Sequence, residues 1–426
     1  MKSITSNGQD SNIIVGIDIG SSKICCVIGK ISDQDNKIKL LGISTVKSAG
    51  LRSGSIIHRD LLIEQIDKVM SESEIMADIK ITKAILSITG DHIRSINTQA
   101  AIALNRGNVT LGTISERSIK LSDTHQVLEL AQAISLPMDR DILHTIPQEY
   151  IVDTIEQIKN PVGMTGRRLE GRVHLVTAAS TPMNNLISCV QELGIEVEGL
   201  VFQPFLSGLT TLTNDEKELG VTLVEIGSST TNIVVYRDNS ICHSAVIPIG
   251  SSSVTNDIAV MLQISLAEAE NIKIKYASAK SSLSSEKLEL NISSKNDKVE
   301  RKISEKEISK YVEARMQEIF QLVIREISRS DIKDPLTYGI VLTGGGAQMR
   351  NIKALAEDNL NVKIRIGTPK GIDGISSIAE EPMHTTPLGL LLWPLEAKDY
   401  ARVGQNSYTG INKFIKSIKD TIEELF

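Results

Sequence analysis

The sequence predicts an α/β protein of two related domains that face each other across a cleft, and two observations support this prediction. Asp18–Ser22 reads Asp-Ile-Gly-Ser-Ser, and Glu225–Ser229 in the second half of the chain reads Glu-Ile-Gly-Ser-Ser. Each motif lies between short runs of alternating apolar residues, which is typical of two strands joined by a tight turn. A repeated strand-turn-strand motif with matched flanks favours two copies of one domain.

The two glycine-serine turns suit an anionic ligand. Glycine and serine expose backbone N–H groups and hydroxyls without a bulky side chain, which is what a phosphate needs. The acidic residue before each turn, Asp18 or Glu225, can hold a hydrated metal ion. A Walker loop and a dinucleotide fingerprint both lead into a helix, whereas here the chain continues after Lys23 as a strand. One such turn alone would be ordinary hairpin chemistry, so the duplication is what favours a phosphate clamp.

Composition excludes several classes of function. The 46 Lys and Arg against 52 Asp and Glu give a net charge of -6, which disfavours binding to nucleic acid. The four cysteines have no C-x-x-C spacing and the seven histidines form no zinc-type pair, so no metal site is expected beyond magnesium bound with a nucleotide. The polar start and the lack of a long apolar run predict a protein that is neither secreted nor membrane-spanning.

The remaining pattern alternates strands and helices around an insertion. Strands are expected at 38–44 and 79–88, with a helix starting at Asp60 between them. The segment 91–171 has a strand, a helix and a turn-rich end of its own, so it is expected to be an inserted subdomain. A strand, a helix and a strand then follow over 173–201, as in a sheet covered by helices.

The second half contains a charged hairpin, a long helix and a glycine-rich strand end. A hairpin is expected over 284–304, and Ser304 with Glu307 forms a capping box that opens the helix. That hairpin also fits an ordinary solvated surface. A strand at 340–343 ends in Gly344, Gly345 and Gly346 and is expected to lead into a helix that carries Met349. Three glycines let the backbone approach a flat ligand closely.

Two phosphate hairpins together with Leu-Thr-Gly-Gly-Gly before a helix resemble the actin-like ATPase superfamily, in which the triple glycine approaches the adenosine. Further motifs narrow the resemblance to the FtsA family of bacterial cell division proteins. These motifs are Ile142–Pro147, Asn160–Met164, Arg168–Glu170 and Pro248–Gly250. The resemblance covers about residues 12 to 426.

The resemblance implies an actin-like ATPase fold with a family-specific inserted subdomain. The implied subdomains are IA (12–92, 172–203 and 372–398), IC (93–171), IIA (204–262 and 331–371) and IIB (263–330). A flexible linker (399–411) and a C-terminal membrane-targeting helix (412–426) would follow.

The resemblance also implies ATP and Mg²⁺ as ligands and assigns their site. Asp18 and Glu225 would contact the magnesium through water, and Gln203 falls where related filament proteins orient a water molecule. The implied nucleotide-binding residues are Asp18, Gly20, Ser21, Ser22, Lys23, Glu225, Gly227, Ser228, Ser229, Thr230, Glu270, Lys273, Gly344, Gly345, Gly346 and Met349. The i,i+3 spacing of Glu270 and Lys273 also fits an ordinary ion pair on a helix surface.

Slow ATP hydrolysis at most is expected. A glutamine at position 203 can orient water but is a poor proton acceptor. Glu225 stands where the superfamily commonly has Asp, and its extra methylene puts turnover in doubt more than binding. The nucleotide is therefore expected to act mainly as a conformational switch.

The C-terminal segment is amphipathic. Its apolar residues share one helix face, and the implied membrane-binding set is Phe414, Ile415, Ile418, Ile422, Leu425 and Phe426. The polar segment 397–410 before it is expected to be a tether. A helix that folds back on its own domain fits the pattern as well, and the family resemblance favours the membrane. The lysines of this helix are offset by acidic residues, so self-association is expected to support attachment.

The function implied by the resemblance is to tether the FtsZ ring to the cytoplasmic face of the inner membrane at the division site, to recruit later division proteins and to self-associate into polymers. Two other functions remain open. A pilus-assembly adaptor with the same insert would lack the terminal helix. A sugar or acetate kinase of the superfamily would need an acidic or basic catalytic residue at a small-substrate pocket.

Overall fold

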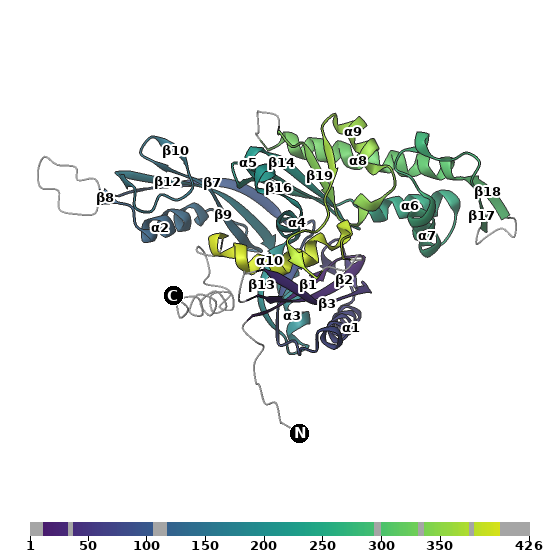
Figure 1. The fold of residues 1–426 in the computed structure, drawn as a ribbon, viewed down its shortest axis with the longest axis horizontal. Coiled ribbons are helices and arrows are strands. Elements are labelled where there is room, and N and C mark those ends of the chain that lie inside the picture. The colour runs from purple at the N-terminus through teal and green to yellow at the C-terminus, as the bar shows by residue number, and fades with distance from the viewer. Residues whose placement is uncertain are drawn as a thin grey trace, which may run out of the picture.

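The structure is a computed structural model that describes residues 12–32, 37–104, 117–293, 300–330, 336–374 and 379–400. Figure 1 shows two α/β domains stacked on each other, with one extension on the left and another on the right. The two domains, the cleft between them and the inserted subdomain agree with the fold predicted from the sequence.

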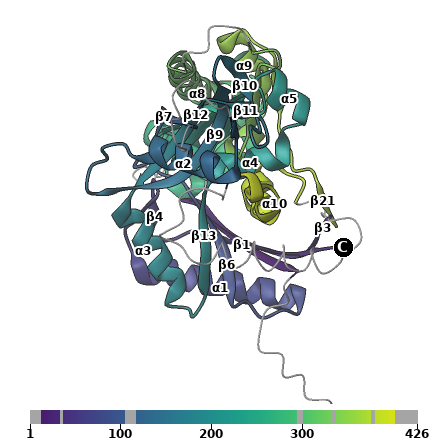
Figure 2. The ribbon, with the colours of Figure 1, turned by 90° about the vertical axis from the view of Figure 1, so that its left-hand side faces the viewer.

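The first domain is built on a six-stranded sheet with the order β13-β6-β1-β2-β3-β21. Strands β1, β2 and β3 form an antiparallel meander, and β6 and β13 run parallel to β1. Helices α1 and α3 lie on the outer side of this sheet (Figure 2). The elements are β1 (Ile13–Ile19), β2 (Lys23–Ile31), β3 (Ile38–Lys47), β4 (Leu51–Arg52), β5 (Ser55–Ile56), α1 (Arg59–Ala77), β6 (Lys83–Ile88), α3 (Ser180–Gln191), β13 (Glu196–Phe202) and β21 (Ile372–Asp373).

The second domain repeats this arrangement. Strands β14, β15 and β16 form the meander, β19 runs parallel to β14, and β20 runs parallel to β19. The first two strands of each meander are joined by one of the two glycine-serine turns, so the duplicated motif does mark two related domains. The elements are α5 (Asn214–Leu219), β14 (Val221–Ile226), β15 (Thr231–Arg237), β16 (Ser240–Ile247), α6 (Ser251–Leu262), β19 (Ile340–Thr343), η2 (Gly345–Gln348), α9 (Ile352–Leu360) and β20 (Ile364–Ile366).

Two helices, α4 (Gln203–Thr211) and α10 (Thr385–Tyr400), fill the space between the two sheets (Figures 1 and 2). Strand β14 shows how the cores are divided. Leu223 packs in the core between the sheets, and its neighbour Val224 packs in the outer core under α6, α9 and the long helix α8 (Glu305–Ser328). Successive side chains of a strand point to opposite faces. Both faces of β14 are therefore buried, and packing on both sides holds this strand in place at the floor of the cleft.

The inserted subdomain is an antiparallel sheet of order β10-β9-β12-β7 with helix α2 on one face and a hydrophobic core of its own. It is anchored to strand β16 of the second domain. Ser95 donates a hydrogen bond to the carbonyl oxygen of Ser244 (2.6 Å), and buried His174 lies between Asn97 and the Ser244 hydroxyl (2.6 and 2.8 Å). The elements are β7 (Arg94–Ala103), β8 (Arg117–Ser118), α2 (Leu121–Gln132), β9 (Arg140–Val152), β10 (Ile155–Ile158), β11 (Thr165–Gly166) and β12 (Arg168–Ala179).

The extension on the right of Figure 1 contains the predicted hairpin and long helix. Ser304 caps helix α8, because its hydroxyl accepts a hydrogen bond from the backbone N–H of Glu307 (3.2 Å). The turn of the hairpin that was predicted over 284–304 lies outside the described residues. The elements are α7 (Leu266–Tyr276), η1 (Ser281–Leu283), β17 (Glu289–Ser293), β18 (Glu300–Ser304) and α8 (Glu305–Ser328).

Two expectations about local structure are wrong. The chain does not enter an α-helix directly after the triple glycine, because the positive φ of Gly344 (82°) turns it into the short 3-10 helix η2 and Met349 precedes α9. Helix α10 continues to Tyr400, so residues 397–400 are helical and not part of the tether. Glu396, Ala397 and Lys398 are strong helix formers, which explains the extension. The amphipathic segment 412–426 with its membrane-binding residues lies outside the described residues.

Candidate functional site

The structure brings the residues predicted to bind the nucleotide together around one cavity. Its volume is about 520 Å³. It is lined from both domains. The lining residues include the two turns, Gln203, the triple glycine, Met349 and the pair Glu270 and Lys273 of helix α7, called the α7 pair below.

The second turn is held by the N-terminus of helix α6. The backbone N–H groups of Ser251 and Ser252 donate to the carbonyl oxygens of Gly227 and Ser228 (2.9 and 2.8 Å). In a trans peptide the C=O and the next N–H point in opposite directions. Anchoring these carbonyls at α6 therefore turns the N–H groups of Ser228 and Ser229 away from the helix. A Cβ at Gly250 would lie 2.4 Å from the Ser228 oxygen, so glycine is needed there.

The first turn is linked to the segment that precedes α10. Its backbone closes through a hydrogen bond from the N–H of Gly20 to the carbonyl oxygen of Lys23 (3.0 Å). The Lys23 ammonium group donates to the carbonyl oxygen of Met383 (2.5 Å) in the short 3-10 helix η3 (Pro382–His384). A single cation thus touches both the first turn and the entrance to α10.

Asp18 lies at the base of the first turn and is buried. Its Oδ1 accepts hydrogen bonds from the Ser87 hydroxyl (2.6 Å) and from the Gln203 amide Nε2 (2.9 Å). Burial raises the pKa of the Asp18 carboxyl, while nearby Lys23 and these two hydrogen bonds act in the opposite direction. Gln203 occupies the first turn of α4, where Pro204 fits because its missing N–H has no helical acceptor.

Glu225 lies at the base of the second turn and is held by three side chains. Its Oε1 accepts from the hydroxyls of Ser207 (2.7 Å) and Thr386, and its Oε2 accepts from the Asn232 amide (2.9 Å). Burial is the main cause that raises the pKa of the Glu225 carboxyl. The longer side chain that replaces the usual Asp is therefore fully accommodated by the fold.

One hydrogen bond crosses the bottom of the cleft between the two domains. The Thr89 hydroxyl, directly after strand β6, donates to Oδ1 of Asn232 in strand β15 (2.7 Å). Asn232 at the same time donates to Glu225 (2.9 Å). The position of one domain relative to the other is thereby tied to the carboxylate of the second turn.

The α7 pair is more than a surface ion pair. Lys273 is 9% exposed, lies 2.8 Å from Glu270 and donates to the Thr255 hydroxyl (2.9 Å). Glu270 also accepts from Thr255. Both side chains are therefore fixed at the cavity wall, where the carboxylate and the ammonium group can meet hydroxyl groups of a ligand.

Each of the three positions 344–346 has its own structural reason for being a glycine. Gly344 needs its positive φ, and a Cβ at Gly346 would lie 2.4 Å from Ile226. A Cβ at Gly345 has its nearest atom, Cβ of Met383, at 4.0 Å. Gly345 is thus the glycine whose lack of a side chain leaves room for a ligand rather than for the protein.

Several residues of the site were not predicted from the sequence. Ser207, Thr386, Asn232 and Thr89 form the hydrogen bonds around Glu225, and Met383 forms the contact with Lys23. Asn232 follows the second motif closely and could have been included on that ground. The others lie far away in sequence, and no local pattern points to them.

Comparison with known proteins decides the family. A family model described as "Cell division protein FtsA" matches residues 222–389, and a model described as "SHS2 domain inserted in FTSA" matches residues 90–177. Cell division protein FtsA of Pseudomonas aeruginosa is 37% identical over 91% of this chain and 90% of its own length. The chain belongs to the FtsA family. FtsA of Borreliella burgdorferi is 36% identical (92% and 93% covered) and FtsA of Escherichia coli is 30% identical (98% and 99% covered).

Solved structures confirm the actin-like fold. The "PilM-PilN type IV pilus biogenesis complex" superposes with a TM-score of 0.64 at 16% identity, covering 89% of this chain and 97% of the other. MreB5 of Spiroplasma citri bound to ADP superposes with a TM-score of 0.53 at 14% identity, covering 91% and 97%. At these identities the likeness of this chain to both solved structures concerns the fold alone. Among the helices that the structure describes, none is long and apolar enough to span a membrane.

Proposed function

We propose that this member of the FtsA family binds ATP with Mg²⁺ between the two glycine-serine turns and uses the nucleotide mainly as a conformational switch. The observation that carries the proposal is the convergence of both turns, the α7 pair and Gly345 on one cavity of about 520 Å³. An MreB of the same fold has been solved with ADP, which supports a nucleotide as the ligand.

The residues present fit this ligand. The N–H groups of Ser228 and Ser229 and the hydroxyls of both turns would hold the phosphates, as backbone donors commonly do. Glu270 and Lys273 would hold the ribose hydroxyls, and the base would lie against Gly345. Asp18 and Glu225 would hold magnesium through water. The hydrogen bonds from Ser87 and Gln203 both fall on Oδ1 of Asp18 and leave Oδ2, and Oε2 of Glu225 accepts from Asn232 and has a second lone pair. When bound, magnesium would neutralise the charge of the phosphates.

The chain's own residues favour slow hydrolysis. Gln203 is fixed by its hydrogen bond to Asp18, so its amide can orient a water molecule, but an amide is a poor base. The two carboxyl groups near the turns are already hydrogen-bonded within the protein. A metabolic kinase would instead need a carboxylate or an amine that is free to act on a small substrate.

We further propose that the protein tethers FtsZ to the cytoplasmic face of the inner membrane, recruits later division proteins and self-associates. Membership of the FtsA family supports these partners. The amphipathic segment 412–426, with Phe414, Ile418 and Leu425 on its apolar face, would provide the attachment. A pilus-assembly adaptor is the less favoured function, because the likeness to PilM concerns the fold alone.

For FtsZ, we propose a docking surface between α6 and α8. A groove of about 350 Å³ lies there, with Val260 (73% exposed) and Met261 (53% exposed) as its apolar wall. Arg315 lies in the groove between the carboxylates of Asp257 (2.6 Å) and Glu318. An apolar wall beside charges of both signs suits a short FtsZ segment with apolar anchors and flanking charges.

Titration with a fluorescent ATP analogue tests the nucleotide part of the proposal. The protein should bind it in the presence of magnesium, and excess unlabelled ATP should displace it. Chelation of magnesium should weaken binding. A protein that shows no saturable binding under these conditions would disprove the nucleotide site and leave the division role to be explained by contacts alone.

A further inference from the structure

Helix α10 begins inside the cleft and ends at the opposite side of the domain. Its first residues, Thr385 and Thr386, are buried, and Thr386 lines the cavity. Its last described residue is Tyr400, which precedes the expected linker and, after it, the amphipathic segment 412–426. A helix of this length spans about 24 Å at 1.5 Å per residue. One helix, with Pro394 inside it, therefore reaches from the second turn to the start of the linker.

Thr386 connects α10 to Glu225. The Thr386 hydroxyl donates to Oε1 of Glu225 and lies 2.8 Å from the hydroxyl of Ser207, which donates to the same oxygen (2.7 Å). Ser207 belongs to α4 and Glu225 to β14. Three elements thus meet at one carboxylate oxygen, and removal of the Thr386 hydroxyl would break the contact with α10.

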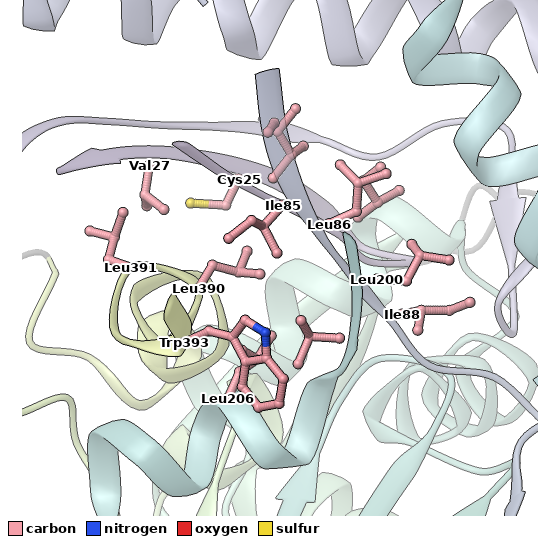
Figure 3. Packing of buried hydrophobic residues seen from close by; sticks show 14 of the residues in the cluster. Cys25, Val27, Ile85, Leu86, Ile88, Leu200, Leu206, Leu390, Leu391 and Trp393 are labelled. Atoms are coloured by element: carbon pink, nitrogen blue, oxygen red, sulfur yellow. The ribbon is translucent and has the colours of Figure 1, made fainter. Parts of the chain in front are cut away.

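The body of α10 is packed too closely to move independently of its neighbours. A Cβ at Gly389 would lie 2.2 Å from the carbonyl oxygen of Leu206 in α4. A Cβ at Gly16 in β1 would lie 2.4 Å from Cβ of Leu390. Figure 3 shows Leu390 and Leu391 facing the sheet beside Val27 and Cys25. Close-packed interiors transmit displacements as rigid-body shifts, so a change at Glu225 can move the whole helix.

We propose that Thr386 is a positioning residue that holds Glu225 at the second turn and transmits the effect of ligand binding in the cleft to helix α10. The inference rests on the proposed nucleotide binding and adds the route by which binding reaches the C-terminal end. A ligand beside Glu225 changes what its oxygens bind, and the Thr386 hydroxyl is the contact through which α10 senses that change.

Substitution of Thr386 by valine or by serine distinguishes the role of its hydroxyl from the role of its branched shape. Thr386→Val keeps the branched shape but removes the donor, whereas Thr386→Ser keeps the donor. Thr385→Val is the matched control, because Thr385 is equally buried and its hydroxyl bonds Pro382 (2.9 Å) and Thr343 (3.0 Å) instead of Glu225. The three variants are first compared for thermal unfolding and for affinity toward a fluorescent ATP analogue.

The test is amide hydrogen exchange of residues 385–400 with and without ATP and magnesium. In the unchanged protein, in Thr386→Ser and in Thr385→Val, ATP should slow exchange in α10 by about tenfold, the size of one intramolecular hydrogen bond. Thr386→Val, compared at ATP concentrations that saturate each protein, should lose most of this protection.

The outcomes separate the two proposals. If the unchanged protein does not bind ATP, the proposed function fails and the coupling fails with it. If ATP binds but exchange in α10 of the unchanged protein does not respond, the coupling alone is wrong, whatever the variants do. Equal protection in Thr386→Val and Thr386→Ser would likewise remove the Thr386 hydroxyl from the route.

Discussion

Gln203 donates a hydrogen bond from its amide Nε2 to Oδ1 of Asp18 over 2.9 Å, and a second to the Ser87 hydroxyl over 3.2 Å. The residue expected to orient water is therefore held against the carboxylate at the base of the first turn. This arrangement fixes the amide, and an amide oxygen is itself a poor proton acceptor. It is the structural reason for expecting a slow ATPase.

Turnover is predicted to stay well below that of metabolic kinases. ATP hydrolysis should be slower than about 10 per second, and Gln203→Ala should lower it further with little change in ATP affinity, because the amide acts on water rather than on the nucleotide. Phosphate release measured with saturating ATP checks both. Rates typical of kinases would favour a metabolic enzyme.

The open position at Gly345 predicts a substitution that blocks the ligand without harming the fold. Gly345→Leu should fold normally, because a Cβ there has no protein atom closer than 4.0 Å, yet its side chain would fill the adenosine end of the cavity. ATP affinity should fall by at least about tenfold. Gly346→Leu is the contrasting variant, because its Cβ would meet Ile226 at 2.4 Å and should lower the melting temperature. Unchanged nucleotide affinity in Gly345→Leu would remove the triple glycine from the site.

Two buried histidines predict a loss of stability in acid. Burial lowers the pKa of His144 and of His174 to about 3, from about 6.5 in an unfolded chain. The unfolded state therefore binds more protons below pH 6.5, and stability is lost as pH falls from there toward 3. From pH 7 to pH 5 each histidine should cost about 2 kcal/mol of unfolding free energy.

Urea unfolding at pH 7 and pH 5 measures this effect. His174→Gln should be less stable at pH 7, because it disturbs the contacts with Asn97 and Ser244, but should lose less stability on acidification. His58→Gln is the control at an exposed position and should retain the full loss. Identical pH dependence in all three proteins would contradict the assignment.

The C-terminal segment is predicted to carry membrane attachment and little of the fold. Truncation after Gly404 leaves α10 intact, so thermal stability and ATP binding should be preserved while liposome binding is lost. Substitution of Phe414 and Ile418 by Glu should have the same effect, because charges enter the acyl boundary at high cost. Unfolding or aggregation of the truncated protein would instead place the segment in the core.

The groove between α6 and α8 predicts a charge-sensitive contact with FtsZ. Arg315→Glu places a third carboxylate beside Asp257 and Glu318 and should weaken FtsZ binding by at least about tenfold, an effect typical of interface hot spots. Arg329→Glu, at the end of α8 and outside the groove residues, is the matched control. Fluorescence anisotropy with labelled FtsZ measures both, and equal weakening would show a general charge effect.

Much of this fold is visible in the sequence because it is local. The glycine-serine turns, the Ser304 cap and the triple glycine each depend on neighbouring residues, and the duplicated turn correctly indicated two related sheets. The pattern of 91–171 indicated the insert, and the resemblance to known families added its identity as subdomain IC and the residues of α7. Local reasoning erred where a single dihedral decides the outcome, as at Gly344, whose positive φ delays helix α9.

The contacts that could not be predicted from the sequence are long-range. Thr386 meets Glu225 although 161 positions separate them, and Thr89 meets Asn232 across 143 positions. Such pairs arise from the stacking of two sheets around α4 and α10, which no periodicity encodes. The hydrogen-bonded shell around Glu225 therefore became visible only in three dimensions.

The most direct test of the central claim is co-sedimentation of the full-length protein with liposomes, with and without ATP and purified FtsZ. The protein should sediment with the liposomes in an ATP-dependent manner and bring FtsZ with it. The Phe414 and Ile418 double substitution should leave both proteins in the supernatant. If FtsZ remains in the supernatant while the unchanged protein sediments with ATP and liposomes, the tethering function is contradicted.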